Sequence, residues 1–200
     1  MSNYSYKSMA TASVDISQLA FSALWTNNKG AKQLPALYEK SGEPVIWQPD
    51  ESLEVPFEPS SYADPDAIRV TLCLNPSESV CETINKIEEW CIATLSKNPT
   101  TLLGVQMTEE QVRERFVSCI KTSDKGWKTL RMKMNRSGRY ALQCFTPDKE
   151  KREHPETWRG CTARPRIIFK GLWLMGKDFG TLLECTHAII QEDCGYECPF

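Results

Sequence analysis

The sequence predicts a mainly β protein with a helical insertion, which is an α+β arrangement. Three patterns predict it. Apolar and polar residues alternate over residues 67–74, as in a half-buried strand. Apolar residues recur at helical spacing between 79 and 120, and the alternation then returns twice between 127 and 190. The 200 residues, 40% of them hydrophobic, are enough to build one good core.

The part of the chain up to about residue 66 is predicted to form only short strands. It holds six prolines, which remove backbone donors and restrict strands to short pieces or sheet edges. They are Pro35, Pro44, Pro49, Pro56, Pro59 and Pro65. The strand at 67–74 follows, with Ile68, Val70, Leu72 and Leu74 on one face.

Two helices are expected next. Ser79 and Glu82 have the spacing of a capping box, and the apolar pattern that follows stops at Asn98-Pro99. Thr108 and Gln111 form a second capping box, and its helix is predicted to run through Ile120. The helical insertion therefore covers about residues 79–120.

Two hairpins are predicted to close the domain. The first joins the strand around 128–134 to residues 140–145 through a turn at 135–138. The second joins residues 166–175 to 181–190 through a turn at 176–180. We expect one domain over residues 1–190 and an acidic tail over 191–200.

The net charge of −2 hides an uneven distribution. Residues 1–110 carry 7 basic and 15 acidic side chains, residues 111–170 carry 16 and 6, and residues 171–200 carry 1 and 5. A basic middle is therefore flanked by acidic segments. Four of its cations lie on the first predicted hairpin, two on the strand and two at the turn: Arg131, Lys133, Arg136 and Arg139.

Aromatic residues are interleaved with these cations. A basic groove with exposed aromatic faces is what binding of single-stranded nucleic acid without sequence readout requires. The predicted phosphate contacts are Arg131, Lys133, Arg136, Arg139, Arg164, Arg166 and Lys170, and the predicted stacking rings are Trp127, Tyr140 and Trp158. Trp158 is preferred because its loop is polar and flanked by arginine. The alternative is that the basic strand face is merely solvated and the rings belong to the core.

The order of elements resembles a known family. The matching parts are Trp47-Gln-Pro-Asp50, Leu53-Glu-Val-Pro-Phe57, the strand at 67–74, the helical insertion, the basic strand at 128–134 and the hairpin from Phe169 to Gly180. In these parts the chain resembles the OB-fold single-stranded DNA-binding proteins of podophages and of large nucleocytoplasmic DNA viruses. The resemblance implies a five-stranded, partly open OB-like barrel that coats exposed DNA strands during replication, recombination or repair.

The same resemblance gives a role to the tail. It implies that an acidic segment with a terminal aromatic residue recruits replication proteins, such as a polymerase, helicase or primase, and competes with DNA for the basic groove. The corresponding residues are Glu192, Asp193, Glu197 and Phe200. A homodimer is also plausible by this resemblance.

Two other classes of function remain open. One is an OB-like protein-interaction or virion structural module that binds no nucleic acid. The other is a small cysteine-dependent enzyme in which Cys185 and His187, two residues apart on a strand, share one face. The chain lacks the usual catalytic motifs, so we expect no enzymatic activity.

No cofactor, metal site or membrane partner is expected. The nine cysteines include no Cys-x-x-Cys pair of the kind that structural zinc sites use. Most lie at apolar positions, as buried thiols do, which favours a reducing intracellular compartment such as the cytoplasm, the nucleus or a viral factory. No apolar run approaches the ~18 residues that a membrane-spanning helix needs.

Overall fold

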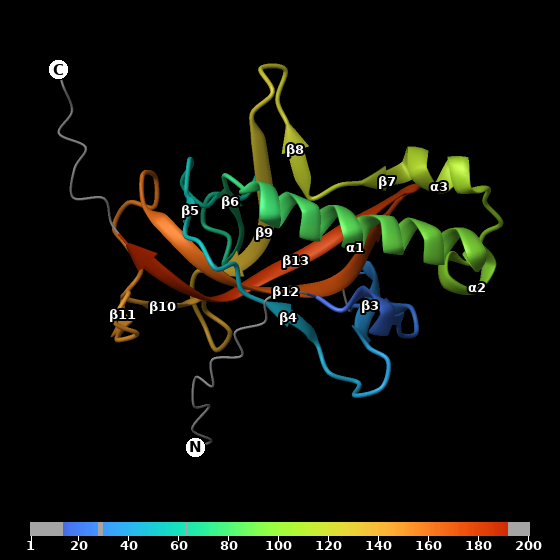
Figure 1. Cartoon of the computed structure of the whole chain (residues 1–200), viewed down its shortest axis with the longest axis horizontal. Helices are drawn as coiled ribbons and strands as arrows, with labels where there is room; N and C mark the ends of the chain where they lie inside the picture. The colour runs from blue at the N-terminus through green and yellow to red at the C-terminus, as the bar shows by residue number, and fades with distance from the viewer. Residues whose placement is uncertain (1–13, 28–29, 63, 192–200) are drawn as a thin grey trace.

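A computed structural model describes residues 14–27, 30–62 and 64–191 (Figure 1). The described chain is mainly β with a helical insertion, as the sequence predicts. The strands β1 to β13 are Leu19–Phe21, Trp25–Thr26, Lys32–Tyr38, Val45–Trp47, Leu53–Glu54, Arg69–Leu74, Phe116–Val117, Ile120–Thr122, Lys128–Asn135, Gln143–Phe145, Lys151–Arg152, Thr162–Met175 and Asp178–Gln191. The helices are a 3-10 turn at Ile16–Gln18, α1 at Glu78–Lys97, α2 at Pro99–Leu103 and α3 at Glu109–Arg115.

The long hairpin of β12 and β13 forms the centre of the sheet, with the other strands on its two sides. It confirms the second predicted hairpin, but it is longer and its turn is tighter, because Met175 already pairs with Asp178. On its other edge β12 pairs with β3, β4 and β5, while β13 pairs with β7, β9 and β10. The register shifts twice, so that Lys170 and Thr186 are bulged residues without a partner in this ladder.

The prediction of a five-stranded barrel is wrong, because the 13 strands form one open sheet. The path β5–β12–β13–β9–β6 surrounds a single core, and within the described residues isolated backbone contacts join the β5 end to the β6 end. Ser60 bridges to Thr71, and the Asn75 amide donates to the Glu54 carbonyl at 2.9 Å. The arrangement is consistent with an OB-like fold whose ladder does not close.

Helix α1 covers one side of the sheet (Figure 1). The helical spacing is confirmed, because its apolar face is buried at Val80, Ile84, Ile87, Cys91 and Leu95. The predicted start is wrong: Ser77, not Ser79, is the N-cap, and its hydroxyl accepts from the Val80 amide. A serine two residues earlier makes the cap that Ser79 was expected to make.

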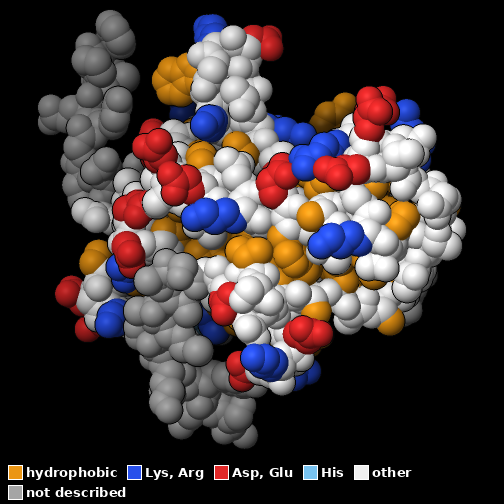
Figure 2. Space-filling view, turned by 45° about the vertical axis from the view of Figure 1, so that its right-hand side comes forward, with side chains coloured by type: hydrophobic (Ala, Val, Ile, Leu, Met, Phe, Trp, Pro, Cys, Tyr) orange, Lys and Arg blue, Asp and Glu red, His pale blue; other side chains and the backbone are white. Residues whose placement is uncertain are grey.

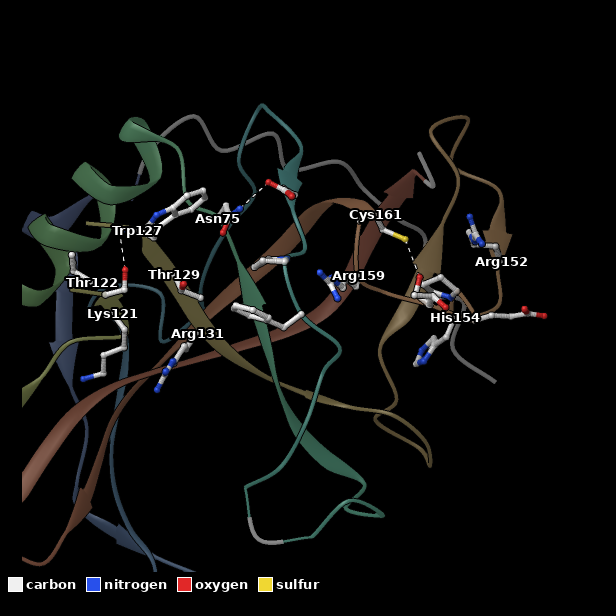
Figure 3. A pocket seen from close by; sticks show the side chains of 18 of the residues that line it. Asn75, Lys121, Thr122, Trp127, Thr129, Arg131, Arg152, His154, Arg159 and Cys161 are labelled. Carbon is white, nitrogen blue, oxygen red and sulfur yellow. Dashed lines mark hydrogen bonds between the residues drawn. The ribbon is translucent and has the colours of Figure 1, made fainter. Parts of the chain in front are cut away.

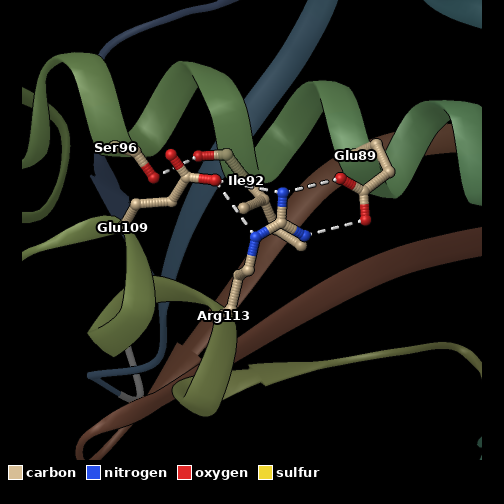
Figure 4. A network of polar contacts seen from close by, with 5 residues as sticks. All are labelled: Glu89, Ile92, Ser96, Glu109 and Arg113. Carbon is tan, nitrogen blue, oxygen red and sulfur yellow. Dashed lines mark hydrogen bonds and ion pairs between the residues drawn. The ribbon is translucent and has the colours of Figure 1, made fainter.

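Helix α3 begins as predicted and ends early. Thr108 and Gln111 form the expected capping box. The helix ends at Arg115, because Phe116 and Val117 pair with β13 as strand β7. Figure 4 shows the polar contact between α3 and α1: Arg113 of α3 bonds to Glu89 of α1 at 2.9 and 3.0 Å. Within α3, Arg113 also bonds to Glu109 at 3.1 Å. The short helix α2 was not predicted.

Strand β6 is confirmed, whereas the first predicted hairpin is wrong. Val70, Leu72 and Leu74 are fully buried, while Ile68 precedes the strand and is 58% exposed. Strand β9 exists as expected, but it pairs with β6 and β8. Strand β10 lies parallel to β13, so residues 140–145 do not return along β9. Alternation places a strand but does not choose its partner.

Gly171 should be essential to the sheet. It has φ +109°, and a Cβ there would lie 2.0 Å from the Leu34 carbonyl oxygen of β3. We expect Gly171→Ala to lower the free energy of unfolding by about 3 kcal/mol or more, measured by urea denaturation.

Gly176→Ala is the matched control in the same hairpin. Its φ is +61°, but nothing lies within 4 Å of the added Cβ. It should cost only the left-handed backbone penalty of about 1–2 kcal/mol. Equal losses in the two variants would contradict the idea that close approach of β3 is the constraint.

Candidate nucleic-acid interface

An open groove with a volume of about 1420 Å³ lies on the outer side of β6 and β9 (Figure 3). The β8–β9 hairpin bounds one end, the segment after β5 lines the middle, and the loop at 152–161 bounds the other end. Thr129 and Arg131 of β9 line the groove, together with Asn75, which directly follows β6. It is thus built from the basic strand that the sequence singles out.

Two exposed aromatic rings line this groove. Trp127 is 69% exposed and Phe57 is 58% exposed. The turn that carries Trp127 is ordered by Ser123, whose amide donates to the Trp127 carbonyl at 2.9 Å and whose hydroxyl accepts from the Trp127 amide at 3.1 Å. An exposed ring on a fixed turn can offer its face to a planar ligand.

Charges of both signs line the groove. Its cations are Lys121, Arg131, Arg152 and Arg159, and its carboxylates are Glu54, Glu153 and Glu156. Glu54 accepts a hydrogen bond from the Asn75 amide nitrogen at 2.8 Å. The groove is therefore only slightly positive, and its exposed rings distinguish it more than its charge does.

Arg131 and Lys133 lie on the predicted outer face of β9. Arg131 is exposed and lines the groove. Lys133 is half-buried, and its Nζ donates to the Thr71 hydroxyl at 2.9 Å. Burial lowers the pKa of Lys133, and the neighbouring positive charge of Arg69 lowers it further. Cations are therefore crowded along this face.

The predicted cations at the turn lie outside the groove lining. The Arg136 guanidinium donates to the Pro65 carbonyl at 2.9 Å and also to the Pro59 carbonyl, so it holds the segment before β6. Arg139 lies over the Tyr140 ring, 5.6 Å from its centroid. Tyr140 is 70% exposed, but it is not among the rings of the groove.

The three predicted cations of β12 also lie outside the groove lining. Arg164 and Arg166 are half-buried and Lys170 is exposed. Burial, and then the charge of Arg166, lower the pKa of His187. The structure therefore brings together only Arg131 and Trp127 of the predicted site residues, with Lys133 next to them on the same strand face.

The expectation that Trp158 lies outside the core is wrong. Trp158 is 6% exposed, and its ring meets the His154 ring edge-on at 5.7 Å between centroids. Its amide donates to the Glu58 carboxylate at 2.9 Å, which folds the polar loop inward. The polar residues around Trp158 did not indicate that its indole is buried, because their side chains face solvent while the indole faces the core.

Among the lysines, arginines and phenylalanine or tryptophan rings of the groove, sequence reasoning missed four: Phe57, Lys121, Arg152 and Arg159. Phe57 continues the alternation of Leu53 and Val55, which are buried, so the pattern predicts an inward ring. Pro56 was the available signal, since a proline ends regular strand pairing.

The proposed pair of Cys185 and His187 is also corrected. The Cys185 thiol is buried, donates to the His187 backbone carbonyl at 3.4 Å, and has a pKa raised by burial. The His187 ring stacks on Phe145 instead. Because Thr186 is a bulged residue, the two side chains do not share a face, and this geometry provides no activated thiolate.

Three further observations concern the cysteines, metal-binding groups and helices of the described residues. The seven cysteines in the described ranges are free, and all but Cys73 are buried. Within those ranges no group of histidine, cysteine and acidic residues could hold a metal ion, and no helix is long and apolar enough to cross a membrane. The predicted tail residues Glu192, Asp193, Glu197 and Phe200 lie outside the described residues.

The surface shown in Figure 2 is of mixed character. Lysine and arginine side chains are interspersed with acidic ones, and an apolar band crosses between them. A basic segment of sequence therefore does not give a uniformly basic surface. The local combination of rings and cations in the groove is more informative than the charge map.

The described fold defines a class: a mainly β, OB-like sheet with a helical insertion. No protein-family model and no curated protein matches the sequence. Among solved structures, the chain is similar to gp2.5, a single-stranded DNA-binding protein encoded by bacteriophage T7. The TM-score is 0.51 at 13% identity, over 74% of this chain and 87% of that chain. The chain thus has the fold of a phage single-stranded DNA-binding protein.

The single-stranded DNA-binding protein of bacteriophage Enc34 gives a weaker likeness. Its complex with single-stranded DNA aligns with a TM-score of 0.48 at 14% identity, over 86% of this chain and 95% of that chain. The protein without DNA gives a TM-score of 0.46 at 14% identity, over 87% and 90%. These alignments are too distant to carry an argument, and the narrower viral class that the sequence suggested stays a prediction.

Trp127 and Trp158 should differ in their effect on stability. Trp158→Ala removes a buried indole and should lower the free energy of unfolding by about 3–5 kcal/mol. Trp127→Ala removes an exposed one and should change it by less than about 0.5 kcal/mol. Urea denaturation of the two variants measures both, and a large loss for Trp127→Ala would contradict its exposed position.

Proposed function

We propose that this protein binds single-stranded DNA without reading its sequence, in viral or phage-like DNA replication, recombination or repair. One observation carries the proposal. A single groove combines the exposed rings of Trp127 and Phe57 with the exposed guanidinium of Arg131. Bases stack on aromatic faces whatever their identity, and cations beside those faces bind the phosphates.

The groove supports a single strand in preference to a duplex. Its rings are useful only to bases whose faces are free, and bases in a duplex already stack on each other. Stacking contributes about 1–3 kcal/mol per base, so two rings suffice for measurable affinity even where charges nearly balance. The fold shared with gp2.5, which is described as a single-stranded DNA-binding protein, supports the same proposal.

The tail and the dimer remain proposals. Gln191, the last described residue, pairs with Thr162, next to Cys161 of the groove lining. The last described residue therefore lies near the groove lining, which supports the competition with DNA that the resemblance implies. Recruitment of replication proteins by Glu192, Asp193, Glu197 and Phe200 also rests on the resemblance, as does a homodimer.

Binding to oligo-dT should be tight at low salt and weaken as salt rises, because phosphate contacts release counterions. Arg131→Glu should weaken binding about tenfold at about 50 mM salt and reduce the slope of log affinity against log salt by about 0.7 or more. Fluorescence anisotropy measures both. The same series on a chain without residues 191–200 tests the tail, whose removal should tighten binding.

Lys86→Glu is the matched control for Arg131→Glu. Lys86 is exposed on α1 and is not part of the groove lining. The control makes the same charge change, so it should bind as the unaltered protein does. Failure of the unaltered protein to bind any single strand at low salt, or equal losses in both variants, would contradict the proposal.

Trp127 should report binding directly. The protein has six tryptophans, and Trp127 is the one that lines the groove. Titration with oligo-dT should quench part of the emission, because a stacked base quenches indole. Trp127→Ala should remove most of the quench and weaken binding by about tenfold, within the 1–3 kcal/mol of one stacked base. Trp158→Ala, where it stays folded, should keep the quench.

A further inference from the structure

The outer face of β6 and β9 leads from the groove to a second hollow. On β6 the side chains of Cys73, Thr71 and Arg69 alternate onto this face, where Cys73 pairs with Arg131 and Thr71 with Lys133 of β9, and Asn75 directly follows the strand. Asn75 and Arg131 line the groove, whereas Arg69 and Lys133 line the second hollow. Arg131 and Lys133 are two residues apart, so the two cavities adjoin across about 7 Å of strand.

The second hollow has a volume of about 1080 Å³. It is bounded by the β2–β3 turn, the segment between α2 and α3, and the tip of the β12–β13 hairpin. Cations gather in it from five different elements or turns, namely Lys32, Arg69, Arg115, Lys133 and Lys177. Among the carboxylates, only Asp178 is part of its lining within the described residues.

The cations along this face are only partly balanced. Arg69 pairs with Glu184 at 3.2 Å. Lys133 bonds to the neutral hydroxyl of Thr71, and its pKa is lowered first by burial and then by the positive charges of Arg69 and Arg131. A row of negative groups along the face would relieve this repulsion.

We propose that the second hollow is a further segment of the same single-stranded DNA site. A strand in the groove continues over Arg131 and Lys133 and reaches Lys32 and Lys177 at the far end. This rests on the proposed function. Its apolar lining, which includes the exposed Leu24, Val105 and Met175, would also suit a protein. Five cations against one carboxylate favour a polyanion.

The geometry predicts a dependence on strand length. Asn75 and Arg69 are six residues apart, which is about 20 Å along an antiparallel strand. A short oligonucleotide therefore fills the groove alone, and a longer one reaches both cavities. A strand stacked as in a duplex rises about 3.4 Å per nucleotide, so about 4 nucleotides are shorter than this distance and about 16 are longer. Both lengths lie within the site sizes of OB folds, and oligo-dT of about 4 and of about 16 nucleotides are suitable probes.

The test is the double variant Lys32→Glu with Lys177→Glu. Both side chains are exposed, so the fold should tolerate the change. We expect about a tenfold loss of affinity for the longer oligonucleotide at low salt and a salt slope smaller by about 1.4, with little change for the shorter one. The matched control is Lys40→Glu with Lys86→Glu, two exposed lysines that line neither cavity.

The outcomes separate this inference from the proposed function. Loss confined to the longer oligonucleotide, with the control unchanged, supports the inference. Unchanged binding of both oligonucleotides by Lys32→Glu with Lys177→Glu overturns it and leaves the groove alone as the DNA site. Equal losses for both lengths, or in the control, overturn it as a general charge effect. Failure of the unaltered protein to bind either length removes both proposals.

Discussion

The pairing of β12 with β13 is the constraint on which the other strands depend. Six other strands pair directly with one of these two within the described residues, namely β3, β4 and β5 with β12, and β7, β9 and β10 with β13. Two glycines make this possible: Gly171 admits the β3 backbone, and Gly180 admits the carbonyl of Val117, which would lie 2.3 Å from a Cβ. The position of β9, and hence of Arg131, follows from the pairing of Lys133 with Glu184.

A buried carboxylate attaches the helical insertion to this sheet. Glu88 of α1 is 8% exposed and accepts from the Thr181 hydroxyl at 2.8 Å and the Cys119 amide at 2.9 Å. A buried carboxyl group needs hydrogen-bond partners, so a shift of α1 along the sheet would break both bonds and leave Glu88 without them. Burial, with Glu88 nearby, raises the pKa of the Cys91 and Cys119 thiols, which keeps both protonated and unreactive.

Local sequence patterns predicted the helices and strands better than they predicted which strands pair with each other. Strand β6, the face of α1, the capping box of Thr108 and the long hairpin all follow from short-range spacing. The parallel pairing of β10 with β13 and the end of α3 at Arg115 depend on contacts distant in sequence, which no local pattern contains. The bulge at Thr186 reverses the alternation that placed Cys185 and His187 on one face. The prediction that Trp158 is exposed was wrong for a related reason, because the composition of a loop does not reveal which of its side chains is buried.

In the proposed DNA site, the two cavities would contribute to binding in different ways. In the groove, four cations face three carboxylates, so its contribution comes mainly from stacking on Trp127 and Phe57, which salt screens little. The second hollow has five cations against one carboxylate, so its contribution is mainly electrostatic and strongly dependent on salt. Arg131 and Lys133 join the two on adjacent outward positions of β9. A net charge of −2 is therefore compatible with the proposed polyanion site, because the fold gathers cations from several strands, a helix and a turn around one hollow.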